Sequence, residues 1–114
     1  MFLGKNKISD INIFQEVYFN KLKELSLISN KISDIQVFEF VKFKNLEKLF
    51  LGNNKISDIK PLAKANFNEL KELYLFNNKI KDIKIFEKDK FGKLETLYLY
   101  DNKIDSLKYK YLFA

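Results

Sequence analysis

The stretch LKELSLISNKISDIQVFEFVKF, from Leu22 to Phe43, decides the fold because its pattern recurs along the whole chain. Asparagine returns every 24 residues, and Leu, Ile and Phe positions keep the same step. The asparagines are Asn6, Asn30, Asn54, Asn78 and Asn102. A fixed period of this size indicates a solenoid of stacked units. The 114 residues therefore predict a single repeat domain of about five units, 1–21, 22–45, 46–69, 70–93 and 94–114.

Each unit begins with a short segment typical of a half-buried strand. In Leu25–Ser26–Leu27 apolar and polar residues alternate, so the two leucines are expected to face the interior and Ser26 the outside. Asn30 follows at the turn, where its amide can both donate and accept hydrogen bonds. Repetition of this residue predicts a ladder of asparagines that bonds the buried backbone of its own unit and of the neighbouring unit.

The segment after the turn is expected to form a short helix. Four residues after each asparagine comes a residue that favours a helix N-cap, and Pro61 occupies a first-turn position. These cap residues are Asp10, Asp34, Asp58, Asp82 and Ser106. A column of carboxylates could instead share a cation, but capping also accounts for the serine. We therefore predict no metal site, and we expect Ile35, Phe38, Phe43 and Leu46 to point inward.

The skeleton L-x-x-L-x-L-x-x-N-x-I resembles the leucine-rich repeat. The ISDI sequences at 32–35 and 56–59 resemble a short subclass found in internalins and in a nuclear regulatory subunit of a type 1 protein phosphatase. The resemblance implies an α/β fold, a leucine-rich-repeat solenoid with a parallel concave β-sheet and short helices on the convex side. It also implies binding through the concave sheet. Units of 24 residues are two longer than is usual in that subclass, and the extra residues are expected to lengthen the helical turn.

Missing residue types exclude many kinds of site. The chain has neither Cys nor His, which excludes disulfides, thiolate nucleophiles, Ser–His–Asp catalysis and cysteine-based zinc sites. We therefore predict no enzyme activity and no cofactor. Apolar runs are far shorter than a bilayer requires, and we see no signal peptide and no glycosylation sequon, so we expect a cytoplasmic protein without a membrane contact.

A lysine follows every repeated asparagine: Lys7, Lys31, Lys55, Lys79 and Lys103. With a net charge of +6, such a column could be a phosphate-binding track. It could equally be a solvated edge, since the aspartate column lies three residues further along each turn. All 21 basic residues are lysines, so no arginine is present to grip phosphate or guanine in bidentate fashion. Nucleic acid is therefore an unlikely partner.

The positions that differ between units are those expected to face outward from the sheet. One such column is Phe2, Ser26, Phe50, Tyr74 and Tyr98, and the next is Gly4, Ile28, Gly52, Phe76 and Tyr100. Aromatic residues could serve only to form strands. However, monomers rarely expose a contiguous apolar patch, and Tyr is enriched in interfaces. We predict that a partner binds Phe50, Tyr74, Phe76, Tyr98 and Tyr100, with Lys48 and Glu72 as a polar rim.

The function predicted from these features is a protein-protein interaction scaffold that binds a protein or peptide through its concave aromatic face. Two alternatives stay open. The chain could be the regulatory subunit of an enzyme such as a protein phosphatase. It could also be a self-associating fragment of a longer repeat array, forming a homo-oligomer through uncapped ends or through the concave face.

Overall fold

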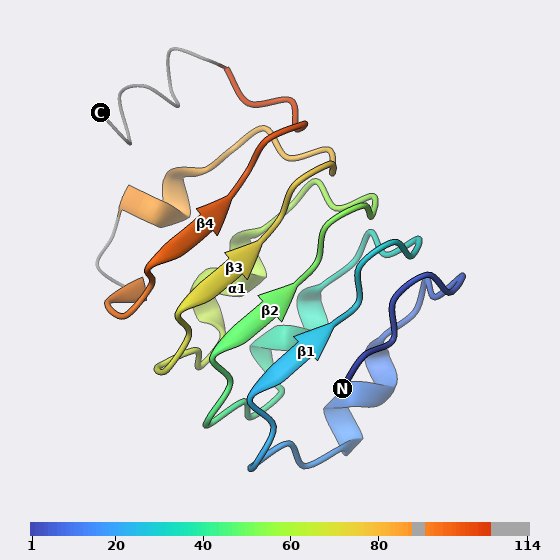
Figure 1. Ribbon diagram of the computed structural model, residues 1–114, viewed down its shortest axis with the longest axis vertical. Helices are drawn as coiled ribbons and strands as arrows, with labels where there is room; N and C mark the ends of the chain where they lie inside the picture. The colour runs from blue at the N-terminus through green and yellow to red at the C-terminus, as the bar shows by residue number, and fades with distance from the viewer. Residues whose placement is uncertain (88–90, 106–114) are drawn as a thin grey trace.

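The computed structural model describes residues 1–87 and 91–105, which build one parallel sheet covered on one side by short helices. The strands are β1 (Glu24–Ser26), β2 (Lys48–Phe50), β3 (Glu72–Tyr74) and β4 (Thr96–Tyr98). They lie side by side in the order β1-β2-β3-β4, as Figure 1 shows. Partners in the register are 24 residues apart, for example Leu25 and Leu49. The predicted α/β repeat solenoid is confirmed.

The first unit contributes less to the sheet than the prediction of one strand per unit implied. Phe2 forms an isolated parallel bridge with Ser26. Two backbone bonds support it, since the N–H of Leu3 donates to the Ser26 carbonyl at 2.8 Å and the N–H of Ser26 donates to the Met1 carbonyl at 2.9 Å. Because this is a single bridge with no second one beside it, the segment is shorter than a strand.

The helices lie behind the sheet and are mostly of the tighter 3₁₀ type. They are η1 (Asn12–Glu16), η2 (Gln36–Glu39), α1 (Lys60–Lys64) and η3 (Lys84–Glu87). Segments this short favour 3₁₀ geometry. Only α1, among the described helices, is α-helical, and it carries Pro61 in its first turn, where a fixed φ suits a helix.

The aspartates do not occupy the N-cap position that we predicted for them. The caps of η1, η2 and α1 are the isoleucines that follow, and none makes a side-chain cap bond. Each aspartate lies one residue earlier, and its Oδ1 accepts from the N–H two residues ahead; the Asp34–Gln36 bond is 2.9 Å long. The carboxylate thus still satisfies a first-turn donor, but through an Asx turn. Ser106 lies outside the described residues.

Two ladders hold the stack together. In the core, the Phe19 and Phe43 rings stack at 5.4 Å and the Phe43 and Phe67 rings at 5.8 Å. At the turns, the predicted asparagine ladder is present: Asn54 Nδ2 donates to the carbonyl of Leu51 and to that of Leu27 in the preceding unit. Its Oδ1 accepts from the Ile32 N–H at 3.0 Å. Every buried polar atom of this side chain is therefore used to fix one unit on the next.

The interior predictions for the second unit hold throughout. Leu25 and Leu27 are fully buried, and so are the helix-side residues Ile35, Phe38, Phe43 and Leu46. Among the described residues no helix is long and apolar enough to cross a membrane. The cytoplasmic location stays a prediction.

Candidate functional site

The outward side of the sheet carries two columns of aromatic rings, which we call the aromatic face: Phe50, Tyr74, Phe76, Tyr98 and Tyr100. The strand register places Phe50 opposite Tyr74 and Tyr74 opposite Tyr98. The Phe50 and Tyr74 ring centroids are 4.5 Å apart with an interplanar angle of 11°. Tyr74 and Tyr98 are 5.0 Å apart and tilted. The structure thus brings Phe50, Tyr74 and Tyr98 into one column.

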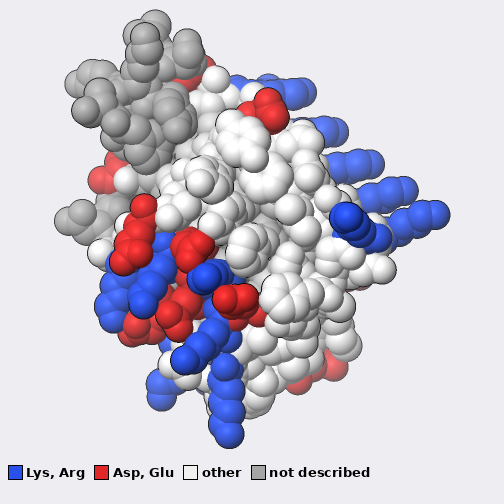
Figure 2. Space-filling model, in the orientation of Figure 1, with Lys and Arg blue, Asp and Glu red and all other residues white. Residues whose placement is uncertain are grey.

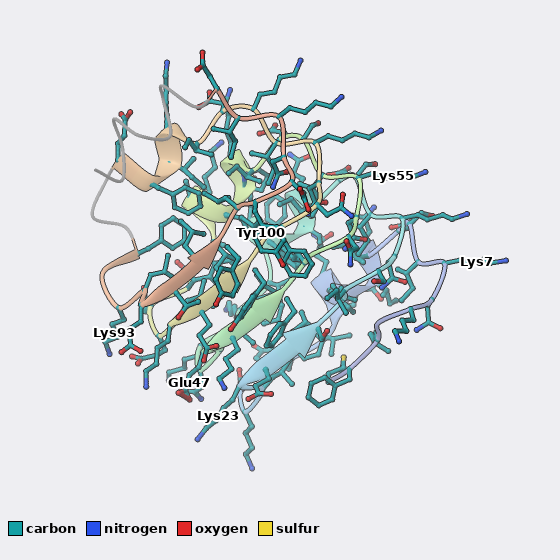
Figure 3. All side chains as sticks on the ribbon, turned by 45° about the horizontal axis from the view of Figure 1, so that its top comes forward. Lys7, Lys23, Glu47, Lys55, Lys93 and Tyr100 are labelled. Atoms are coloured by element: carbon teal, nitrogen blue, oxygen red, sulfur yellow. The ribbon has the colours of Figure 1, made fainter. Side chains whose placement is uncertain are left out.

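The second column is built in the same way and joins the first. Phe76 and Tyr100 stack at 5.0 Å with an angle of only 6°. Tyr98 meets Tyr100 edge to face at 6.0 Å, which links the columns at β4. Figure 3 shows Tyr100 lying over the sheet. All five predicted aromatic residues therefore form one continuous surface.

The aromatic face is open to solvent, most of all at its C-terminal side. Tyr98 and Tyr100 are 47% and 57% exposed, whereas Phe50, Tyr74 and Phe76 are half-buried. Figure 2 shows an uncharged surface running across the strands between two groups of charged side chains. Nothing among the described residues of the chain covers this surface.

Stacking determines which part of the rings a partner meets. Rings that are nearly parallel with centroids 5.0 Å apart stack with an offset, so each covers part of the other's face. The facing sides of the Phe50–Tyr74 and Phe76–Tyr100 pairs are therefore partly occupied, whereas Tyr98 is tilted against both of its neighbours. Ring edges carry partial positive charge and suit carbonyl oxygens, thioethers and the faces of other rings.

A glycine makes room for the second column, and the sequence did not reveal this role. A Cβ at Gly52 would lie 2.4 Å from Cζ of Phe76 and 2.6–2.7 Å from two further ring atoms. The Phe76 ring therefore lies across Gly52 in the neighbouring strand. At Gly4, a Cβ would meet Cγ2 of Ile28 at 2.8 Å in the same way. Ile28 and Phe76 thus each lean toward the preceding unit, onto a glycine, whereas Tyr100 stacks on Phe76.

The predicted polar rim is an internally paired strip beside the first column. Lys48 Nζ lies 3.5 Å from a Glu24 carboxylate oxygen and 3.2 Å from one of Glu72. Tyr74 donates its hydroxyl to Glu72 Oε1 at 2.5 Å. Lys48 and Glu72 are therefore brought together with the aromatic face, and the strip carries little net charge.

These contacts shift the pKa values of the rim. The hydrogen bond from Tyr74, with further help from Lys48, lowers the pKa of Glu72 below its ordinary 4.5. The same bond, together with burial, raises the pKa of Tyr74 to about 12. The hydrogen bond and the charge of Glu72 raise the pKa of Lys48. All three groups stay in their usual ionisation states at neutral pH.

The turn after each strand contains a second feature that the sequence analysis missed. One residue per unit has a left-handed backbone with φ between 51° and 58°: Lys5, Ser29, Asn53, Asn77 and Asp101. Asn and Asp tolerate this conformation best after Gly, so three of the five types could have revealed it. Asn77 Nδ2 donates to Asn53 Oδ1 at 2.6 Å, and Asn53 Nδ2 to Ser29 Oγ at 3.3 Å. A short side-chain ladder thus runs beside the asparagine ladder.

Ser26 differs from its expected exposure. It belongs to the outward column, yet it is buried, while Phe2 on one side of it is 73% exposed. A small side chain between two phenylalanines in register, Phe2 and Phe50, is covered by its surroundings rather than by the core.

The convex side shows a different kind of surface. A shallow hollow of about 250 Å³ is lined by residues that include Tyr18, Phe40 and Lys42. Tyr18 and Phe40 are exposed aromatic residues outside the aromatic face. Within the residues described, no group of three or more His, Cys, Asp or Glu side chains is arranged to hold a metal ion.

Comparisons with known proteins agree with the architecture. Residues 20–80 match the family model described as leucine rich repeat, and residues 68–110 match one described as leucine rich repeats in two copies. No curated protein matches the chain.

Two similar solved structures are internalins from Listeria monocytogenes. An internalin superposes with a TM-score of 0.75 at 32% identity, over 90% of this chain and 28% of that one. An internalin C2 superposes with a TM-score of 0.73 at 30% identity, over 87% of this chain and 40% of that one. The chain thus spans well under half the length of either structure. With its repeat, its sheet and a family model over more than half of its residues in agreement, the chain belongs to the leucine-rich repeat family and is internalin-like in structure.

Proposed function

We propose that this repeat protein is an interaction scaffold that binds a protein or peptide segment through the aromatic face, with Lys48 and Glu72 at its rim. The observation that carries the proposal is the pair of stacked aromatic columns, held on the outward side of the sheet and open to solvent. Rings that are already stacked lose little side-chain freedom on binding, which favours affinity.

The chemistry of the face favours a protein over a small molecule. An open sheet encloses little volume, whereas small ligands are bound in concave pockets. Tyrosines supply large apolar area together with hydroxyl groups, as in many interfaces. Partial stacking within the Phe50–Tyr74 and Phe76–Tyr100 pairs leaves less free ring face for sugars and nucleobases. We assign no catalysis to the chain.

Affinity should concentrate in the centre of the face. Tyr74 and Tyr98 each contact two other members of the face and Phe76 stacks on Tyr100, so these three are the expected hot spots. Truncation of each to Ala is expected to weaken binding by about 1–3 kcal/mol. The partner, which could be an enzyme that the scaffold regulates, is to be identified by experiment.

The test is affinity purification of the tagged protein with quantitative mass spectrometry. The Tyr74→Ala, Tyr98→Ala double variant is compared with wild type and with a Tyr18→Ala, Phe40→Ala double variant. The control also removes two exposed rings, but from the convex side. We expect a specific partner to be lost from the first variant and retained by the second. Equal retention by both, with intact folds by circular dichroism, would contradict the proposal.

Self-association through the same face is separated by sedimentation of the purified protein. If the partner is a second copy, wild type sediments as a dimer and the Tyr74→Ala, Tyr98→Ala variant as a monomer. If wild type is a monomer even at high concentration, the partner is a different protein.

A further inference from the structure

A row of lysines, Lys7, Lys31, Lys55, Lys79 and Lys103, runs along the turns that follow the strands, and we call it the lysine row. All five side chains are exposed. Figure 2 shows a regular row of basic side chains projecting from one edge, and Figure 3 shows Lys7 and Lys55 pointing away from the body of the protein.

The backbone fixes the spacing of the row. The N–H of Lys31 donates to the Ile8 carbonyl, and that of Lys55 to the Ile32 carbonyl, both at 2.8 Å. The lysines of the last two units are bonded to the preceding unit in the same manner. Neighbouring lysines therefore follow the strand separation of about 4.8 Å.

The residues just before the strands, at the end opposite to the lysine row, carry charges of both signs. There, successive units alternate in sign, as in the column Lys23, Glu47, Lys71 and Glu95. Lys71 lies 3.3 Å from Glu47, and Lys93 lies 2.8 Å from Glu69. Charges of opposite sign therefore pair before the strands, whereas the turns after the strands carry only positive charges in the lysine row.

No carboxylate of the described residues forms an ion pair with the lysine row. None of the ion pairs between described residues includes one of its members. The nearest acidic column is bonded to the backbone instead, as the 2.9 Å bond from the Lys60 N–H to Asp58 Oδ1 shows. Asp101 and Asp105 each lie two residues from Lys103 along the chain. Parallel like charges at this spacing repel one another, and an external anion relieves that repulsion.

We propose that the lysine row binds an acidic peptide segment of the protein partner that occupies the aromatic face. The row is one lysine wide, so it fits a single linear series of anions. Phe76 and Lys79 are three residues apart, as are Tyr100 and Lys103, so one partner can span both surfaces. The inference rests on the proposed function, because it takes this segment to belong to the protein bound at the aromatic face.

Nucleic acid is the competing polyanion, and the structure favours it less. Single-stranded binders combine a basic groove with free aromatic faces on which bases stack. Here two pairs of rings partly cover each other's faces, and the chain has no arginine. Flexible ammonium groups suit carboxylates without any demand for bidentate geometry.

The test measures binding of a fluorescein-labelled 12-residue poly-L-glutamate by anisotropy at several salt concentrations. A Lys31→Ala, Lys55→Ala, Lys79→Ala variant removes the centre of the row. A Lys21→Ala, Lys42→Ala, Lys44→Ala variant is the matched control, because these lysines are also exposed and make no described ion pair. A third variant, with arginine at the three row positions, keeps the charge.

We expect the row variant to bind about tenfold more weakly at low salt and to show a flatter salt dependence. The control should change affinity by less than about threefold, and the arginine variant should bind like wild type. If the row variant and the control lost the same affinity for poly-L-glutamate, net charge alone would explain the binding and the proposal would be overturned. Absence of poly-L-glutamate binding to wild type would overturn it as well.

Labelled 12-mer oligothymidylate is the second probe. If it binds the lysine row more tightly than poly-L-glutamate does, the acidic-peptide assignment is wrong and the row is a nucleic-acid track. The Tyr74→Ala, Tyr98→Ala variant should bind poly-L-glutamate as wild type does. The proposal for the aromatic face and the proposal for the lysine row can therefore be refuted independently of each other.

Discussion

The inward and outward columns of the sheet share the same 24-residue period but not the same freedom to vary. The inward column that contains Leu25 keeps leucine in every strand, whereas the outward column changes from Ser26 through Phe50 to Tyr74. Inward residues are buried between two neighbours in a close-packed interior, where a change of volume is costly. Outward residues meet solvent or a partner. Packing therefore explains the first column, and binding is the proposed reason for the second.

The largest predicted difference between the two sides concerns single aromatic residues. Phe43→Ala removes a fully buried ring stacked between two others, and we expect it to lower the free energy of unfolding by about 3–5 kcal/mol. Phe50→Ala removes a half-buried ring with one stacking partner and should cost about 1 kcal/mol. Urea titration measures both. Similar costs would mean that the aromatic face is part of the folding core.

The asparagine ladder gives the next largest effect. Asn54→Ala leaves the Ile32 N–H without its acceptor and removes one of the two asparagine donors from each of the Leu27 and Leu51 carbonyls, at a cost of about 1–3 kcal/mol. Lys55→Ala, one residue further along the exposed edge, should change stability by less than about 0.5 kcal/mol. If urea titration gave the two variants equal midpoints and slopes, the ladder would not be what fixes one unit on the next.

Gly52→Ala should disturb the aromatic face more than the fold. The added methyl group cannot coexist with the present Phe76 ring, which must swing away toward solvent. We expect a loss of stability below about 1 kcal/mol, less than overpacking costs in a core. Ring-current shifts of Phe76 and Tyr100 in NMR spectra should change, while those of Phe50 and Tyr74 provide the internal reference. Unchanged shifts for the Phe76–Tyr100 pair would refute the role of Gly52.

The smallest effect concerns ionisation at the rim. Tyr74→Phe removes the main cause of the lowered Glu72 pKa, so that pKa should rise toward 4.5 in a carboxyl NMR titration. Tyr98→Phe is the control and should leave the Glu72 pKa where it is. Because the pKa of Glu72 is lowered in the folded state, its contribution to stability is complete above about pH 4.5 and is lost as the pH falls through the lowered value.

The same bond can be followed from its other end. Glu72→Gln should bring the pKa of Tyr74 down from about 12 toward 10.0, as measured by phenolate absorbance. Raised in the folded state, this pKa gives a contribution that is present below pH 10.0 and lost as the pH rises through about 12. A Tyr74 pKa that stays near 12 in the variant would assign the shift to burial.

Features that repeat in every unit could be predicted from the sequence. The period placed Phe50, Tyr74 and Tyr98 in one column, and the strand register confirms that placement. The inward leucines and the asparagine ladder follow from the same period. Each of these depends only on a residue type at a fixed position.

Features that depend on how neighbouring units touch could not be predicted in this way. The helix N-caps were predicted one residue too early, at the aspartates, because capping and Asx turns use the same residue types. The role of Gly52 depends on the lean of Phe76 in the next strand, which no single unit encodes. Two expectations failed, that Ser26 would be exposed and that the first unit would form a strand. Both depend on what the first unit contributes to the sheet.

Site-specific photo-crosslinking tests the central claim most directly. A benzophenone amino acid replaces Tyr98 on the aromatic face in one protein and Tyr18 on the convex side in another; both positions carry exposed aromatic residues. After irradiation in cell extract, the account predicts a discrete protein adduct from position 98 and none from position 18. An adduct from position 18 alone would contradict it and would move the binding surface to the convex side.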